Sequence, residues 1–178
     1  MSNIHPEFWS GKRVFLTGHT GFKGSWLSLW LQSMGVELYG FSLQTPTTPA
    51  LFDEAKVHKN MATTLGDVRN FDSVLAAIQI CKPDIIFHMA AQPLVRYSYE
   101  APLETFDTNI MGTVHVLEAA RRVSSVRAIV NVTTDKCYEN RELDWAYRED
   151  EAMGGYDPYS SSKACSELVT STYRRSFF

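Results

Sequence analysis

The stretch from Arg13 to Gly24, which reads Arg-Val-Phe-Leu-Thr-Gly-His-Thr-Gly-Phe-Lys-Gly, constrains the fold most strongly. Residues 14–16 are apolar and have the strand propensity of a buried parallel strand. Three glycines follow, and a helix is expected next with Trp26, Leu27, Trp30, Leu31 and Met34 on one apolar side. Strand, glycine loop and helix N-terminus together suit an anionic diphosphate, because free backbone N–H groups and the positive helix end face it.

Each glycine has an expected role in such a site. Gly18 permits the tight turn, Gly21 lets the backbone approach the diphosphate, and Gly24 lets helix and strand pack closely. The alternative is an ordinary glycine-rich turn, since a motif of three glycines is weak evidence by itself. A predicted strand and helix flank this one as the motif requires, which favours dinucleotide binding.

Strands and helices are predicted to alternate along the rest of the chain. Further strands are expected over residues 37–43, 61–65, 84–89 and 128–133, and helices over 71–78, 103–123 and 159–177. This order predicts an α/β fold with a doubly wound parallel sheet, a dinucleotide-binding Rossmann domain over residues 1–178. The end, Ser176-Phe177-Phe178, leaves two aromatic residues unburied on a helix, so we expect an interrupted chain.

Composition argues against several classes of partner. The net charge of −3 gives no basic excess for nucleic acid, and no apolar run approaches the roughly 18 residues of a membrane helix. Residues 1–9 lack the basic start and apolar core of a signal peptide. The three cysteines, outside any metal-ligand spacing, indicate reduced thiols, no metal site and a cytoplasmic protein; they are Cys81, Cys137 and Cys165.

Tyr159 and Lys163 form a second candidate site. They lie four residues apart on a predicted helix, so their side chains are neighbours. An ammonium about 4 Å from the phenol favours the phenolate by about 4 kcal/mol and would bring the pKa of Tyr159 near 7. The alternative is an exposed pair on a helix face.

Thr133, Thr134, Asp135 and Lys136 follow the predicted strand at 128–133, which we expect to be buried. Ligands of open parallel sheets sit beyond the carboxyl ends of the strands, so these residues are candidates for catalysis. The alternative is an aspartate that caps a turn beside a solvated lysine.

Several motifs occur in the order typical of extended short-chain dehydrogenases/reductases. They are Thr17-Gly18-x-x-Gly21-x-x-Gly24, Asp67-Val68, His88-x-Ala90-Ala91, Asn109, Thr134 and Tyr159-x-x-x-Lys163. The chain resembles that family over nearly its whole length, and Thr134-Asp135 with an ionisable neighbour is similar to its nucleotide-sugar 4,6-dehydratases. Lys136 stands where relatives that act on TDP- or GDP-sugars usually carry glutamate. The stretches 8–12, 19–26, 90–96 and 134–138 look most like dehydratases of CDP-glucose.

The resemblance implies NAD as cofactor and a set of site residues. Catalysis would use Thr134, Asp135, Lys136, Tyr159 and Lys163. NAD would contact Gly18, His19, Gly21, Phe22, Lys23, Gly24, Ser42, Asp67, Val68, Ala90, Ala91, Gln92, Asn109, Thr133, Tyr159 and Lys163. Related enzymes form homodimers through a four-helix interface and continue into a sugar-binding domain that this chain lacks.

The end of the strand at 37–43 departs from the usual pattern. It lacks the acidic residue that commonly binds the adenosine ribose, so Ser42, Gln44 or Thr45 would take that place. Because no arginine occurs between Lys23 and Lys56, a ribose 2′-phosphate has no evident partner, which favours NAD over NADP.

The implied reaction is oxidation of a nucleotide sugar at C4, loss of water across C5–C6 and return of hydride to C6, as in deoxysugar and O-antigen biosynthesis. Tyr159 would take the C4 hydroxyl proton while Thr134 orients that hydroxyl. A buried, protonated Asp135 would donate to the departing C6 hydroxyl. Lys136 is expected to remove the C5 proton as a neutral amine. The alternative is that Lys136 stays charged and stabilises the enolate, with a water or another residue as the base.

Two alternatives use the same scaffold. A 4-epimerase or reductase needs Tyr159 and Lys163 but has no use for the extra acid, Asp135. A non-catalytic dinucleotide-binding domain would keep the glycine loop without a reason to keep the Tyr–Lys pair.

Overall fold

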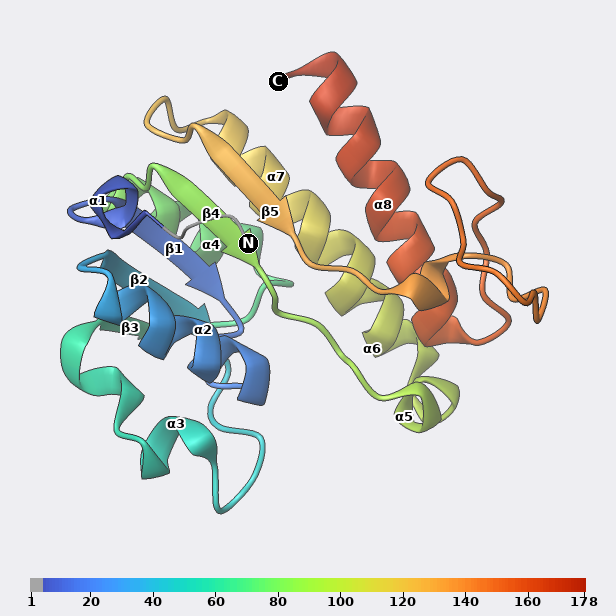
Figure 1. The fold of residues 1–178 in the computed structure, drawn as a ribbon, viewed down its shortest axis with the longest axis horizontal. Coiled ribbons are helices and arrows are strands. Elements are labelled where there is room, and N and C mark those ends of the chain that lie inside the picture. Colours follow the sequence, from blue (N-terminus) through green and yellow to red (C-terminus); the bar gives the residue numbers. More distant parts are fainter. Residues whose placement is uncertain (1–4) are drawn as a thin grey trace.

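The computed structural model describes residues 5–178. Residues 1–4, which begin the segment in which no signal peptide is expected, lie outside the described residues. Within 5–178, five parallel strands form one sheet in the order β3-β2-β1-β4-β5 (Figure 1). The strands are β1 Arg13–Thr17, β2 Glu37–Ser42, β3 Ala62–Leu65, β4 Ile85–His88 and β5 Ala128–Asn131. Phe15 in central β1 pairs with Tyr39 of β2 and Ile86 of β4. The predicted parallel α/β sheet is confirmed.

Helices connect the strands as expected, with some short additions. The helices are α1 Pro6–Trp9, α2 Phe22–Ser33, α3 Leu51–Glu54, α4 Phe71–Cys81, α5 Val95–Glu100, α6 Pro102–Phe106, α7 Gly112–Arg121 and α8 Pro158–Ser176. The short turns are η1 Val57–Asn60, η2 Asp107–Met111 and η3 Asp135–Cys137. The helix expected over 103–123 is α6 and α7 joined end to end by the π-helical turn η2. None of the helices within 5–178 combines the length and hydrophobicity that crossing a membrane requires.

Helices cover both faces of the sheet, which confirms the doubly wound arrangement (Figure 1). On one face, Phe15 and Ile86 pack with Val74 and Ile78 of α4 and residues of α7. On the other face, the strands pack against α2, where Leu31 is the most buried apolar side chain.

The prediction of which side of α2 is buried is wrong in part. Trp26 and Trp30 are 55% and 51% exposed, whereas Gly24, Ser25 and Ser28 are buried with Leu31. The reason is the close approach of the first turns of α2 to the glycine loop, which leaves room for small side chains only.

The expectation that β5 is a buried strand is also wrong. β5 lies at the edge of the sheet, and Ala128 and Val130 on one of its faces are exposed. Its other face packs toward the α4–α7 side, where Ile129 joins the core. The carboxyl end of β5 nevertheless points to the same sheet edge as the glycine loop, because all the strands are parallel.

Candidate active site

A cavity of about 600 Å³ opens at the carboxyl edge of the sheet. Its lining joins the glycine loop, the ends of β2, β4 and β5, and the first turns of α8. Of the residues expected to bind the cofactor, the lining contains Gly18, Gly21, Phe22, Lys23, Gly24, Ser42, Asp67, Val68, Ala90, Ala91, Gln92, Thr133, Tyr159 and Lys163. Segments that are far apart in the sequence thus meet around one space large enough for a dinucleotide.

The glycine loop has the shape that a diphosphate requires. Gly18 has a φ of +77°, and a Cβ there would lie 2.8 Å from the backbone nitrogen of Ala90. A Cβ on Gly24 would lie 2.1 Å from the carbonyl oxygen of Gly18, so the helix packs directly on the turn. Gly21 is the N-cap of the 12-residue helix α2 and has no side chain to occupy the first N–H groups. The backbone and the nearby Lys23 therefore fit a dinucleotide diphosphate.

The end of β2 supplies hydroxyl and amide groups to the cavity. The Ser42 hydroxyl lies 2.7 Å from that of Thr20, which also donates to the carbonyl of Leu43. Ser42 and Gln44 line the cavity, so they have the placement expected of ribose contacts, whereas Thr45 lies outside the lining.

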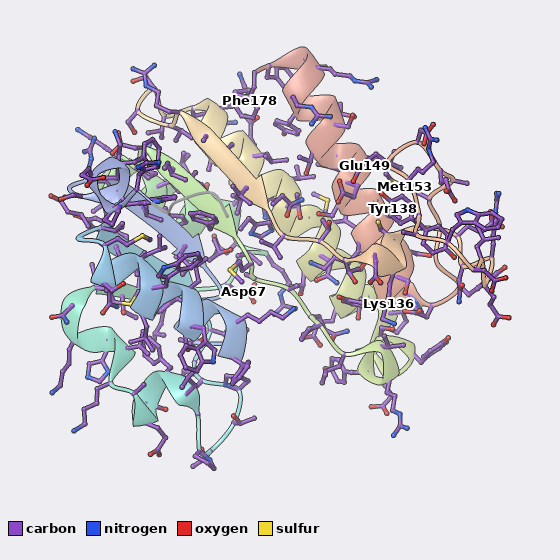
Figure 2. All side chains as sticks on the ribbon, in the orientation of Figure 1. Asp67, Lys136, Tyr138, Glu149, Met153 and Phe178 are labelled. Carbon is purple, nitrogen blue, oxygen red and sulfur yellow. The ribbon has the colours of Figure 1, made fainter. Side chains whose placement is uncertain are left out.

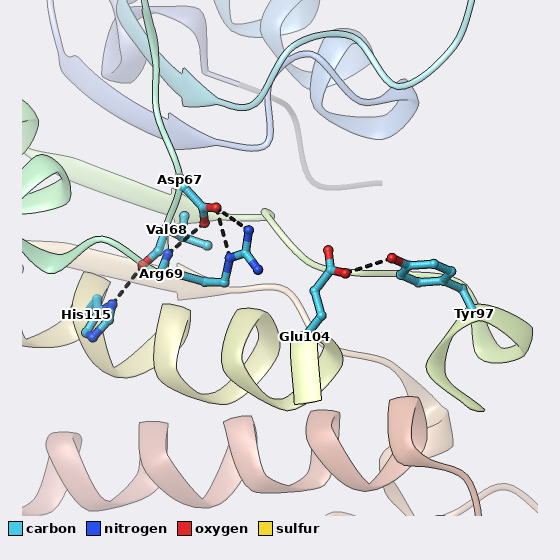
Figure 3. Close-up of polar contacts among 6 residues, drawn as sticks. All are labelled: Asp67, Val68, Arg69, Tyr97, Glu104 and His115. Carbon is cyan, nitrogen blue, oxygen red and sulfur yellow. Dashed lines mark hydrogen bonds and ion pairs between the residues drawn. The ribbon is translucent and has the colours of Figure 1, made fainter. Parts of the chain in front are cut away.

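Arg69 is a cavity residue that the sequence analysis missed. Its guanidinium donates to the Asp67 carboxylate at 2.6 and 2.9 Å, and its backbone N–H donates to the same side chain (Figure 3). These hydrogen bonds hold the pKa of Asp67 below its usual value. The neighbouring carbonyl of Val68 accepts a hydrogen bond of 2.8 Å from the His115 ring on α7. The Asp-x-Arg spacing is the local signal that could have found this turn.

We expected Asn109 and His19 to contact the cofactor. Both are buried and lie outside the cavity lining. Asn109 is 2% exposed; its amide accepts from the Gln92 backbone at 2.8 Å and donates to the Gln92 carbonyl and to Ser162 of α8. It therefore fixes the segment after β4 against α8. Its geometry gives it a structural part in the site.

His19 is fully buried beneath the glycine loop. Its ring lies edge-on to Phe52 with centroids 5.2 Å apart, and a Cβ on Gly40 would overlap it at 2.5 Å. Within residues 5–178, neither ring nitrogen has a hydrogen-bond partner. Burial lowers the pKa of His19 to about 4, so the ring is neutral at pH 7.

Lys163 is buried at the inner end of the cavity. Its ammonium donates to the carbonyl oxygen of Val132 at 3.2 Å. Burial lowers the pKa of Lys163 to about 8; the carboxylate of Glu167 opposes this shift, and Lys23 adds to it. Most of the side chain population is therefore charged at pH 7.

The expected lowering of the pKa of Tyr159 by Lys163 is wrong for this structure. Burial raises the pKa of the phenol, and the negative charges of Asp157 and Asp135 add to the rise. A hydrogen bond with Thr134 acts in the opposite direction without cancelling it. The physical reason is that burial disfavours the charged phenolate more than the neighbouring groups favour it.

The residues that follow β5 form the turn η3 beside the start of α8 (Figure 2). The Thr134 hydroxyl donates to the Asp135 carboxylate at 3.1 Å. Asp135 and Lys136 are exposed and lie outside the cavity lining. The expected burial of Asp135 is therefore wrong, because the turn directs its side chain to solvent.

His88, a motif residue to which the sequence assigned no role, is buried under the site. His88 at the end of β4 is 2.8 Å from the Thr17 hydroxyl and 3.2 Å from the Thr113 hydroxyl. The Thr113 hydroxyl lies 2.9 Å from Ser166 of α8. Burial, with repulsion from Lys163, lowers the pKa of His88 to about 3, so it connects sheet and helices as a neutral ring.

Comparisons with known proteins agree with this geometry. The sequence model of the family described as GDP-mannose 4,6 dehydratase matches residues 15–178. The chain belongs to this family.

Two curated relatives and one solved structure show how similar the chain is to individual proteins. CDP-glucose 4,6-dehydratase of Salmonella typhimurium is 58% identical over 98% of this chain and 49% of its own length. CDP-paratose 2-epimerase of Salmonella typhi is 30% identical over 93% of this chain and 54% of its own length. The solved UDP-glucose 4-epimerase of Thermus thermophilus, a complex with NAD, superposes with a TM-score of 0.78 at 27% identity and covers 93% of this chain and 51% of that one. The chain thus spans about half the length of the relatives it matches.

Proposed function

We propose that residues 1–178 are the NAD-binding portion of a dehydratase that converts CDP-glucose to its 4-keto-6-deoxy sugar. The observation that carries the proposal is the shared cavity, which brings the glycine loop together with Tyr159 and Lys163 of α8. The 58% identity to a relative named CDP-glucose 4,6-dehydratase supports the choice of reaction and nucleotide. The proposal places the enzyme in the synthesis of deoxysugars for O-antigen polysaccharide.

The residues that line the cavity have the chemical groups that binding of NAD requires. The diphosphate would lie over Gly21 and the first turn of α2, beside Lys23, and the adenosine end near Ser42 and Asp67. When bound, the cofactor would accept hydride from sugar C4 in its oxidised form and, once reduced, return it to C6; the positive charge of the oxidised form would favour a phenolate. The guanidinium of Arg69 is engaged by Asp67, so the adenosine end offers a ribose 2′-phosphate no free arginine in the described lining.

Tyr159 acts as the base at the C4 hydroxyl in this proposal. The phenol lines the cavity, and the Thr134 hydroxyl would favour the phenolate once it turns from Asp135 to donate to the Tyr159 oxygen. The raised pKa of Tyr159 must fall in the complex, which a charged Lys163 and a cationic ligand both promote. Lys163 supplies the fixed positive charge and the hydrogen-bond donor at this end of the cavity.

We assign Asp135 and Lys136 to the elimination step, although both lie outside the cavity lining in the structure. Oxidation at C4 acidifies the C5 proton, so water is lost only after that step. The acid therefore protonates the C6 hydroxyl after C4 has been oxidised. Asp135, whose carboxylate lies 3.1 Å from the Thr134 hydroxyl, is the acid that we assign to this step, and it must take up a proton before it can donate to the C6 hydroxyl. Lys136 is exposed, so we assign its ammonium stabilisation of the C5 enolate, while a water takes up the C5 proton.

The assembly and the compartment are part of the proposal. The exposed apolar side chains Met111 of η2 and Leu168 of α8 support a homodimer that pairs these helices across a two-fold axis. The free cysteines Cys81, Cys137 and Cys165 suit the reducing cytoplasm.

Product analysis tests the proposal. The full-length protein, purified and supplied with NAD, is incubated in turn with CDP-glucose and with the UDP-, TDP- and GDP-sugars. We expect a 4-keto-6-deoxy product, detected by its absorbance in base, from CDP-glucose. A C4 epimer would assign the protein to the epimerases, and conversion of another nucleotide sugar alone would overturn the choice of CDP.

A further inference from the structure

The carboxyl end of β5 is joined to α8 by side-chain hydrogen bonds at successive residues. The carbonyl of Val132 accepts from Lys163, and the next residue, Thr133, donates its hydroxyl to the carboxylate of Glu167. Because Thr133 and Lys163 both line the cavity, these contacts set the shape of its inner wall.

Asn131, the residue before Val132, extends this seam of hydrogen bonds between the end of β5 and α8. The side-chain amide of Asn131 donates to the Ser166 hydroxyl at 2.9 Å and to the Thr170 hydroxyl at 2.8 Å. These hydrogen bonds therefore hold two turns of α8, from Lys163 to Thr170, against the end of β5. Within this seam, Glu167 is the acidic member, and the proposed mechanism gives it no part.

Glu167 also faces the charge of Lys163. The spacing of Tyr159, Lys163 and Glu167 by four residues puts all of them on one side of α8. Of the charged groups that act on Lys163, Glu167 is the negative one and Lys23 of α2 is positive. His88, from β4, is neutral at pH 7 and faces the same ammonium.

We propose that Glu167 is a positioning residue for the active site, which fixes Thr133 at the cavity wall and places a carboxylate four residues after Lys163 on the same side of α8. The proposal rests on the proposed function, in which Lys163 contacts the cofactor and supports Tyr159. Without the carboxylate, a lysine buried beside another cation loses its proton at a lower pH. The neutral amine would still donate to Val132, but it would no longer stabilise a phenolate.

Two substitutions separate the hydrogen bond from the charge. Glu167→Gln keeps an oxygen that accepts from Thr133 and removes the charge, while Glu167→Ala removes both. Glu7→Gln, an exposed position on α1, makes the same change of charge away from the cavity and is the control. Thermal unfolding of each full-length variant reports whether it folds.

The direct measurement is the titration of Lys163 by nitrogen NMR of selectively labelled lysine side chains in the full-length protein, with the signal assigned by its loss in Lys163→Met. We expect wild type and Glu7→Gln to titrate at about pH 8. Glu167→Gln should titrate about one pH unit lower. Identical titration in wild type and Glu167→Gln would overturn the proposal, whether or not Glu167→Ala folds.

NAD affinity measured against pH is the second readout. We expect the alkaline limit of binding to move down by about one pH unit in Glu167→Gln, and Glu167→Ala to lose affinity at every pH as well. These readouts need no turnover, so a wild type that binds NAD but leaves CDP-glucose unchanged would end the proposed function and leave the role of Glu167 intact.

Discussion

The ammonium of Lys163 on α8 lies 3.2 Å from the carbonyl oxygen of Val132, the first residue after β5. The bond ties the helix that carries Tyr159 to the strand end that carries Thr133 and Thr134. Lys163 is thereby positioned by the fold, and its charge is available at the cavity wall before any ligand arrives.

This relationship predicts that substitutions of Tyr159 and Lys163 reduce kcat and NAD affinity to different extents. Tyr159→Phe should lower kcat by about 10²- to 10⁴-fold, as expected for removal of a general base, and leave NAD affinity nearly unchanged. Lys163→Met should lower both kcat and NAD affinity, since its side chain lies in the cavity lining. Isothermal titration with NAD and turnover of CDP-glucose by the full-length protein measure the two effects. Equal losses of affinity in both variants would contradict the assignment.

The glycine loop gives a matched pair of substitutions. Gly24→Ala should strongly destabilise the protein, because the added Cβ would lie 2.1 Å from the Gly18 carbonyl oxygen, a backbone atom. Gly21→Val should fold nearly normally, because a Cβ there would meet that oxygen at 3.4 Å, but should lose NAD because the side chain enters the diphosphate site. Thermal unfolding and NAD content of the purified variants test both. Normal NAD content in Gly21→Val would show that the diphosphate lies elsewhere.

Local spacing was enough to predict the parts of the site that lie within one element or one turn. The glycines of the loop and the pair Tyr159 and Lys163 line the cavity as the motifs required. Helical periodicity misplaced Trp26 and Trp30, because burial on α2 is decided by how closely Gly24 approaches the turn at Gly18. Propensity therefore located the helix but could not say which side packs.

The remaining misses depend on long-range contacts. Thr133 and Glu167 are 34 residues apart, so no local pattern indicates that they touch. The exposure of Asp135 follows from the direction in which the turn η3 leaves the sheet edge. The link of His88 to Thr17 and Thr113 exists because three elements converge there.

The buried histidines predict a loss of stability in acid. The folded-state pKa values of His19 and His88, about 4 and about 3, lie below the unfolded value of 6.5, so the unfolded state binds more protons between these limits. Their contribution is complete above pH 6.5 and decreases as the pH falls, by about 2 kcal/mol per histidine between pH 7 and 5. Urea unfolding of the full-length protein at pH 7, 6 and 5 measures the loss. His19→Leu should remove about half of it; an unchanged acid loss would contradict the burial of a neutral ring.

Lys136 should prove dispensable for proton removal at C5. Lys136→Met is expected to retain deuterium exchange at C5 from solvent, at a rate lowered about tenfold, because a charge that stabilises the enolate is lost. Lys136→Glu should exchange no faster than Lys136→Met, since it puts a negative charge beside the developing enolate. Loss of exchange in Lys136→Met with recovery in Lys136→Glu would instead identify Lys136 as the base.

The most direct test of the account follows one hydrogen atom of the sugar. CDP-glucose labelled with deuterium at C4 is incubated with the full-length protein and NAD, and the product is examined by NMR and mass spectrometry. A dehydratase with this site returns the label to C6 of a 4-keto-6-deoxy sugar, without net consumption of NAD. A label that returns to C4 with inverted stereochemistry, or that accumulates as reduced cofactor, would contradict the account.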